Sequence, residues 1–129
     1  MKYFALVALL LVCAVPMFGQ ASTFQNTCSG LTFSYGNGSQ ALLTAWCLQA
    51  NGTARQSSLA LQGVSNQNGN LVVSGSGASS FQQSCGNIMI SGNASGATLS
   101  ALCRNSSGGT NASSVALNGI RNNNGSLSY

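Results

Sequence analysis

The sequence contains no aspartate, no glutamate and no histidine among its 129 residues. General acid–base catalysis near neutral pH usually depends on a carboxyl or an imidazole group. Metal sites draw on the same side chains or on free thiolates. Serine and threonine are abundant, but the chain has no base that would activate their hydroxyl groups as nucleophiles. The composition therefore argues against an enzyme and against a metal site, and it predicts no cofactor.

Positive charge is also scarce, because the only basic residues are Lys2, Arg55, Arg104 and Arg121. Binding to nucleic acid needs a cluster of cations that neutralises phosphates, and these residues are scattered. We expect the arginines to keep an otherwise neutral protein soluble. Low charge predicts disorder only where apolar residues are few as well. Here leucine, valine, isoleucine, phenylalanine and alanine are plentiful, so a packed core is expected.

Long apolar runs are missing except at the start of the chain. Lys2 precedes an apolar run from about Phe4 to Val15, and Pro16 and small residues follow it. This is the pattern of a secretory signal peptide and is too short for a membrane span. We predict a signal peptide at residues 1–21, cleaved after Gly19-Gln20-Ala21. The rest, residues 22–129, is predicted to be a single secreted, extracellular domain with no membrane partner.

Five cysteines occur, and Cys13 lies in the predicted signal peptide. The four that remain are Cys28, Cys47, Cys85 and Cys103. An even number of cysteines in a small exported domain indicates disulfide bonds rather than thiol chemistry. Four cysteines allow three pairings, and their spacing does not choose among them.

The two halves of the chain repeat each other. Phe24-Gln-Asn-Thr-Cys28 corresponds to Phe81-Gln-Gln-Ser-Cys85, and Asn68-Gly-Asn-Leu71 corresponds to Asn124-Gly-Ser-Leu127. Such matches in register indicate one module duplicated in tandem. We assign the repeats to residues 22–73 and 81–129, joined by a Ser/Gly-rich linker at 74–80. Equivalent repeats favour the local disulfides, Cys28 with Cys47 and Cys85 with Cys103.

The apolar residues alternate with a period of two, as in Leu43, Ala45 and Cys47 and again in Leu99, Ala101 and Cys103. This period is typical of strands. Asn-Gly pairs separate the runs and are strong hairpin-turn signals, because both residues tolerate positive φ. We therefore predict an all-β fold of short strands and hairpins. The linker has two interpretations: a flexible connection, or a hinge for a domain-swapped dimer.

The tandem repeats of about 55 residues, one disulfide in each, and the phrases FQNTC, S-x-L-x-L and Asn-Gly-x-Leu resemble the cyanovirin-N homology (CVNH) family. The resemblance covers residues 23–129. It implies an elongated all-β fold with pseudo-twofold symmetry, in which the halves exchange strands, and it implies the local disulfide pairing. It also implies a shallow pocket at each end for terminal α1,2-linked mannose, so the expected partners are high-mannose glycans bound by a monomer or a domain-swapped dimer.

When the sugar-binding positions of the family are transferred to this sequence residue by residue, the resemblance implies two pockets. The first pocket would contain Asn26, Thr27, Leu48, Ala50, Asn51, Asn122, Asn123 and Asn124. The second pocket would contain Ser65, Asn66, Gln67, Asn68, Ser80, Gln83, Ser84, Arg104, Asn105 and Ser106. Mannose-binding members of the family carry acidic residues in these pockets, which this chain lacks. Because Leu48 and Ala50 remove polar contacts from the first pocket, we expect the second to bind better.

Several of these residues have a second interpretation. Asn68 and Asn124 suit hairpin turns without any sugar contact, and Arg104 suits a solvated strand end. Trp46 suggests stacking on a sugar, but its counterpart is Leu102 and both adjoin a cysteine, which favours packing. Three of the six glycosylation sequons, at Asn51, Asn105 and Asn124, fall on the implied pockets. The leading hypothesis is a secreted lectin; the alternative is a structural or interaction protein that has lost sugar binding.

Overall fold

A computed structural model describes residues 20–129, so the predicted signal peptide lies almost wholly outside the described residues. The described chain consists of short strands and single turns of 3-10 helix, and no helix in it is long and apolar enough to cross a membrane. The first repeat supplies β1 (Cys28–Tyr35), β2 (Ala41–Leu48), β3 (Ala54–Ala60), β4 (Gln62–Gln67) and β5 (Asn70–Ala78). The second supplies β6 (Cys85–Asn93), β7 (Gly96–Arg104), β8 (Thr110–Leu117), β9 (Arg121–Asn123) and β10 (Ser126–Ser128). The 3-10 turns are η2 (Phe24–Asn26), η3 (Asn37–Ser39) and η4 (Phe81–Gln83).

Each repeat forms an antiparallel three-stranded sheet, β1-β2-β3 in the first and β6-β7-β8 in the second. Cys28 lies directly opposite Cys47 in the register of β1 and β2, and Cys85 lies opposite Cys103 in β6 and β7. Both local disulfides are formed. The pairing favoured by symmetry is therefore confirmed, as is the all-β fold.

The core follows the alternation seen in the sequence. Leu43, Ala45 and Cys47 are fully buried on the inner face of β2, because successive side chains of a strand point to opposite faces. Their counterparts on β7 are buried in the same way. Phe24 in η2 and Phe81 in η4 are also fully buried and belong to the same cluster. One continuous core thus joins the two halves.

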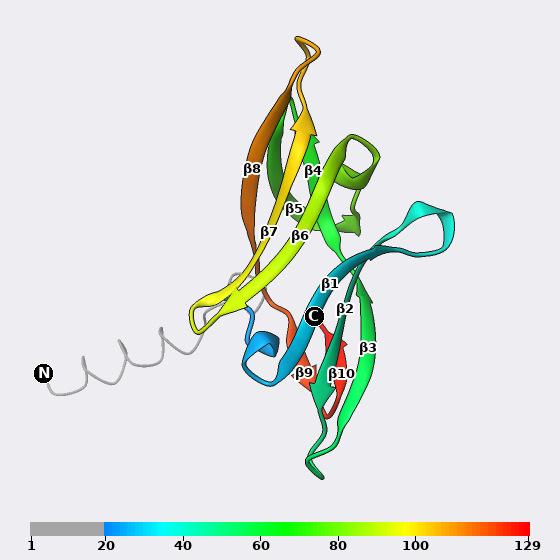
Figure 1. The fold of residues 1–129 in the computed structure, drawn as a ribbon, viewed down its shortest axis with the longest axis vertical. Helices are drawn as coiled ribbons and strands as arrows, with labels where there is room; N and C mark the ends of the chain where they lie inside the picture. Colours follow the sequence, from blue (N-terminus) through cyan, green and yellow to red (C-terminus); the bar gives the residue numbers. More distant parts are fainter. Residues whose placement is uncertain (1–19) are drawn as a thin grey trace, which may run out of the picture.

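The halves exchange hairpins. Figure 1 shows that the β4–β5 hairpin of the first repeat lies beside β8, while the β9–β10 hairpin of the second lies beside β3. The backbone amide of Leu71 donates a hydrogen bond to Ser113 Oγ, and that of Leu127 donates to Ser57 Oγ, both at 2.9 Å. Each end of the elongated molecule is therefore built from a sheet of one repeat and a hairpin of the other, as the family resemblance implied.

Two buried serines hold the segments where the chain crosses between halves. Ser79 Oγ donates to the Leu61 carbonyl and accepts from the Val64 amide. Its counterpart Ser22 donates to the Leu117 carbonyl and accepts from the Ile120 amide. Each hydroxyl satisfies two backbone groups that would otherwise be buried without partners. The crossovers are consequently fixed by hydrogen bonds as well as by packing.

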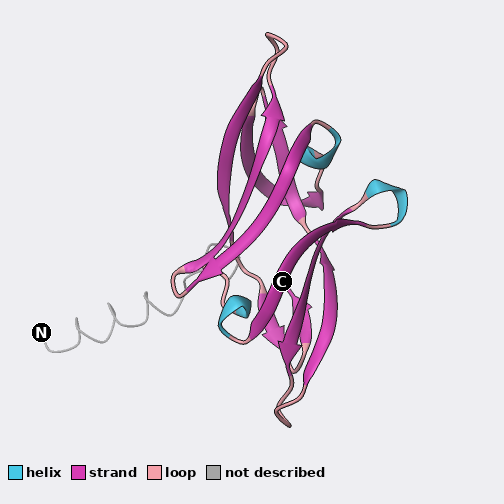
Figure 2. Ribbon diagram, viewed as in Figure 1, coloured by secondary structure: helices cyan, strands magenta, loops and turns pink. Residues whose placement is uncertain are grey.

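The segment expected to be a loose linker is partly a strand. Residues 74–78 complete β5, one of the strands drawn in magenta in Figure 2. Ala78 pairs with Gln62 of β4. Strand pairing uses backbone groups, so a Ser/Gly composition does not prevent it. The register shifts between Gln62 and Val64, which makes room for the extra residues of β5 as a bulge. Whether two chains exchange hairpins remains a prediction.

Candidate functional site

The two hairpin turns predicted from Asn-Gly pairs lie at opposite ends of the molecule. Asn68 and Gly69 join β4 to β5, and Asn124 and Gly125 join β9 to β10. All four residues have positive φ, between 52° and 93°, as a type I′ turn requires. Each turn rests against loops of the sheet contributed by the other repeat. The structure thus brings together residues far apart in the chain, in the two groups that the resemblance implied.

At the second end, Asn66 connects the hairpin to the sheet. Its Nδ2 donates to Ser84 Oγ at 2.9 Å and to the Arg104 carbonyl at 3.0 Å, and its Oδ1 accepts from the Gly69 amide at 2.7 Å. The amide group therefore uses donor and acceptor atoms to hold the turn against β7. Its primary role is structural.

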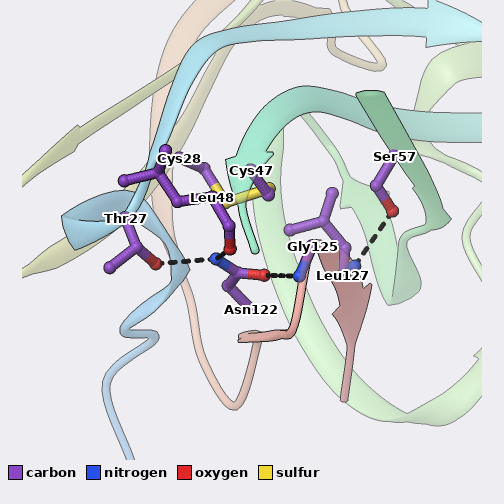
Figure 3. The surroundings of a disulfide bond; sticks show 8 residues. All are labelled: Thr27, Cys28, Cys47, Leu48, Ser57, Asn122, Gly125 and Leu127. Atoms are coloured by element: carbon purple, nitrogen blue, oxygen red, sulfur yellow. Dashed lines mark hydrogen bonds between the residues drawn. A yellow bond between two sulfur atoms is a disulfide. The ribbon is translucent and has the colours of Figure 1, made fainter. Parts of the chain in front are cut away.

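At the first end, Asn122 makes the equivalent contacts. Figure 3 shows Asn122 Nδ2 donating to Thr27 Oγ1 and to the Leu48 carbonyl, both at 2.9 Å, while Oδ1 accepts from the Gly125 amide. The Cys28–Cys47 disulfide lies beside this network (Figure 3). The repeated phrase of the two turns therefore repeats a set of hydrogen bonds.

Asn68 and Asn124 use their side-chain oxygens in the same way. Asn68 Oδ1 accepts from the Ser106 amide, and Asn124 Oδ1 accepts from the Ala50 amide, each at 2.7 Å. Both residues are exposed. The interpretation of these residues as turn formers is correct, and any contact with a sugar would come in addition to it.

A hollow of about 340 Å³ lies on the outer face of the second sheet, β6-β7-β8, at the second end of the molecule. It contains three residues of the predicted second pocket, Gln83, Ser84 and Arg104. The other residues of the lining are not predicted from the sequence as site residues; they are Cys85, Gly86, Asn87, Leu102 and Thr110. Asn87 lies at a bulge of β6 with a positive φ of 49°, and the register shift there turns the strand locally.

The hollow combines polar groups with an apolar floor. Amides of Gln83 and Asn87 offer donors and acceptors, the Thr110 hydroxyl offers both, and the exposed Arg104 guanidinium offers only donors. Leu102 supplies apolar surface. These groups suit a ligand that has many hydroxyl groups and that does not depend on a carboxylate of the protein. The lining provides no base, and residues 20–129 contain no cluster of metal-ligating side chains.

The remaining residues of the predicted second pocket are not part of the lining of the hollow. Asn105 Oδ1 accepts from the amides of Ser107 and Gly109 and so shapes its own loop. Ser65 Oγ accepts from Gln67 Nε2 at 3.1 Å. Ser80 is exposed just before η4. These side chains are at the correct end of the molecule but are partly occupied by local contacts.

The first end has a different surface at the corresponding place. In the second sheet, Leu102 lies between Gly86 and Ala112 in register, and these small neighbours leave the hollow open. In the first sheet the same three positions hold Trp46, Ser29 and Gln56. Trp46 is 49% exposed on the outer face, so the prediction that it packs inside is wrong. Its side chain points away from the core because its neighbours in sequence, Ala45 and Cys47, are the buried ones.

The other predicted residues of the first end are mostly turn contacts. Asn51 Oδ1 accepts from the amide and the hydroxyl of Thr53, which closes the loop between β2 and β3. Asn26 and Asn123 are exposed, and Ala50 and Leu48 contribute backbone groups to the hydrogen bonds described above. That the second end binds better than the first stays a prediction.

A larger groove of about 890 Å³ lies near the middle of the molecule and contains none of the predicted site residues. Val73, Leu117, Arg121 and Tyr129 are among its lining residues. The Tyr129 hydroxyl accepts a hydrogen bond from the Gln62 amide at 3.0 Å. Burial raises the pKa of Tyr129, and the hydrogen bond from Gln62 opposes that shift.

Solved structures share this fold. The T. borchii CVNH protein is 28% identical, covers 83% of this chain and 98% of its own, and superposes with a TM-score of 0.61. A designed cyanovirin-N homologue lectin is 26% identical, with the same coverage and a TM-score of 0.59. Microvirin, solved as a mannobiose complex, is 23% identical, covers 83% of this chain and 97% of its own, and has a TM-score of 0.58.

No curated protein matches the chain significantly. The CVNH domain model, in contrast, matches residues 24–128, which include both sheets and both exchanged hairpins. The sequence repeat, the local disulfides and the hairpin exchange agree with this match. The chain belongs to the cyanovirin-N homology (CVNH) family.

Proposed function

We propose that this protein is a non-catalytic lectin that binds a neutral sugar in the hollow at its second end. The observation that carries the proposal is the lining of that hollow, where amide, hydroxyl and guanidinium groups surround an apolar floor. Hydroxyl groups of a sugar need directional donors and acceptors, and these side chains supply them. The volume of about 340 Å³ is within the range of small-ligand sites.

Mannose-containing glycans are the sugars that we propose first. Family membership supports this choice, as does the mannobiose bound to microvirin. In this chain Asn68 and Gln83 stand where mannose-binding members carry carboxylates. Amides make weaker hydrogen bonds than carboxylates because they carry no charge. We therefore expect weak binding at a single site.

Catalysis is not part of the proposal, since the sequence has no carboxylate or imidazole side chain to transfer a proton. We also propose that the protein is secreted, on the basis of the signal-peptide pattern at residues 1–21. N-terminal sequencing of protein recovered from the culture medium tests secretion: a chain that begins at Ser22 supports it, and retention of Met1 contradicts it.

Titration calorimetry with α1,2-mannobiose, after a screen on an array that includes high-mannose glycans, tests the binding site. Arg104→Ala is expected to weaken binding by about tenfold, because it removes a charged hydrogen-bond donor. Arg121→Ala is the matched control, since Arg121 is exposed but lies at the central groove. Equal affinities for Arg104→Ala and wild type would contradict the placement of the site. A blank array from folded protein would contradict the lectin proposal and favour the interaction-protein hypothesis.

A further inference from the structure

Trp46 presents half of its surface to solvent on the outer face of the first sheet, near the end of the middle strand β2. It lies directly opposite Ser29 of β1 and Gln56 of β3. Figure 1 shows β2 between β1 and β3. The Cδ1 atom of Trp46 lies against the β1 bulge, where a Cβ added to Gly30 would be 3.5 Å away. That is an ordinary van der Waals distance, so the indole packs on the bulge, and glycine is favoured there by its φ of +63°. Leaving a large aromatic side chain exposed forgoes the free energy of burying it.

The surface around Trp46 carries no charge. Residues directly opposite one another in a sheet share a face, so the neighbours of Trp46 on this face are Ser29, Thr44, Gln56 and Leu48. Arg55 is opposite Cys47 and belongs to the inner face. Thr44 Oγ1 is hydrogen-bonded to Ser58 Oγ at 2.9 Å, which fixes the next row of hydroxyl groups. The face is thus an aromatic platform with neutral hydrogen-bonding groups on both sides.

These features match the shape and polarity of one kind of sugar. In a β-1,4-linked chain of pyranoses with equatorial substituents, the hydroxyl groups point outward at the rim and each ring face consists of C–H bonds. Such a face is flat and apolar and can stack on an indole ring. The rim hydroxyls would then meet the Gln56 amide on one side and the Ser29 hydroxyl on the other. An anionic ligand would find no cation on this face.

We propose that the outer face of β1-β2-β3 is a second binding site, in which Trp46 stacks against a neutral β-1,4-linked oligosaccharide. This site goes beyond the function proposed above, because it lies on the other sheet and recognises a ring face rather than a set of hydroxyl groups in a hollow. The exchange of Trp46, Gly30 and Gln56 for Leu102, Asn87 and Ala112 makes the two ends different in specificity.

Tryptophan fluorescence tests this site directly, since Trp46 is the only tryptophan of the chain. Titration of the oxidised protein with cellotetraose is expected to shift the emission to shorter wavelength and to protect it from quenching by acrylamide. Arg104→Ala should keep the whole response, because its side chain belongs to the other sheet. N-acetylchitotetraose, in a parallel titration, shows whether the acetamido group is also accepted.

Calorimetry with the same sugars supplies the second measurement. Trp46→Leu introduces the residue of the second sheet and should weaken cellotetraose binding by about tenfold or more. Trp46→Phe should restore part of the affinity, since it keeps an aromatic face. Circular dichroism and a thermal melt show whether each variant is folded. The proposal is overturned if neither tetrasaccharide changes the emission, or if folded Trp46→Leu binds as tightly as wild type. If mannobiose failed to bind the wild-type protein, the hollow at the second end would be in doubt, but the proposed Trp46 site would not.

Discussion

Asn66 and Asn122 illustrate how much one side chain can determine in this molecule. Each uses its amide nitrogen to hold two groups of the other repeat, one on a strand and one at the end of a 3-10 turn, and its oxygen to hold the turn of its own hairpin. Alanine at either position would leave the amide of Gly69 or Gly125 and a carbonyl of the opposite repeat without these partners. Both glycines are buried, so water would replace the lost hydrogen bonds poorly.

We therefore predict that Asn66→Ala lowers the free energy of unfolding by about 2 kcal/mol. Chemical denaturation of the oxidised protein measures this change. Asn123→Ala is the control, because Asn123 is exposed on β9 and is expected to change stability little. A loss for Asn66→Ala no larger than that of the control would show that the hydrogen bonds do not hold the hairpin.

The sequence predicts the end of the molecule at which each asparagine lies. It does not predict which atoms of the side-chain amide bond within the protein and which stay available to a ligand. Asn-Gly identifies a turn because both residues tolerate positive φ, and this is a local property. Two partners of Asn66, Ser84 and Arg104, belong to the other repeat, so they depend on the tertiary fold. Asn87 was missed for the same reason: it reaches the hollow through a bulge of β6, and no local pattern predicts that bulge.

At the level of elements, the bulge between β4 and β5 depends on Gly63. Its φ is +72°, and a Cβ added there would collide with the carbonyl oxygens of Ser74 and Gly75. Both the conformation and the contact exclude larger side chains. Gly77, on the same strand as those carbonyls, has open space around the position of a Cβ and no positive φ to favour glycine.

Gly63→Ala is accordingly expected to destabilise the protein by more than about 1 kcal/mol, whereas Gly77→Ala should be neutral or slightly stabilising. Thermal and chemical denaturation of both variants provides the comparison. Equal effects of the two substitutions would contradict the close contact that we describe between β4 and β5 at the bulge. Alternating apolar residues predict the sheets. The Ser/Gly composition of residues 74–80 predicts a flexible linker instead of the bulged strand that is present there.

For the whole molecule, the absence of aspartate, glutamate and histidine has a direct consequence for pH dependence. Stability changes with pH only where the folded and unfolded states bind different numbers of protons. Tyr129 is the group whose pKa is raised, chiefly by burial. Its unfolded counterpart, with a pKa of 10.0, loses its proton first, so the unfolded state gains stability as the pH rises past that value.

We predict a free energy of unfolding that is nearly constant from about pH 5 to pH 9 and falls above about pH 10. Denaturation at a series of pH values measures the curve. Tyr129→Phe removes this ionisation, so the alkaline decline should be less steep in the variant even if its stability at neutral pH is lower. A steep change between pH 5 and pH 9, or an identical alkaline decline in the variant, would contradict this account.

The repeat predicted the twofold plan of the molecule, but it did not decide which sheet each hairpin joins. Either hairpin could pair with its own repeat or with the other, because the two repeats present similar surfaces. In the structure the crossovers are held by buried groups: Ser22 and Ser79 each bind two backbone groups, and Phe24 and Phe81 are buried in the core. The family resemblance implied this exchange, whereas strand periodicity alone did not.

We have proposed that the second end of the molecule binds a neutral sugar in the hollow beside Arg104. Titration of ¹⁵N-labelled protein with α1,2-mannobiose, followed by amide chemical shifts, tests it most directly. The account predicts saturable shifts concentrated at residues 83–87, 102–104 and 110. Shifts confined to the central groove around Arg121 and Tyr129, or no shifts at all from folded protein, would contradict it.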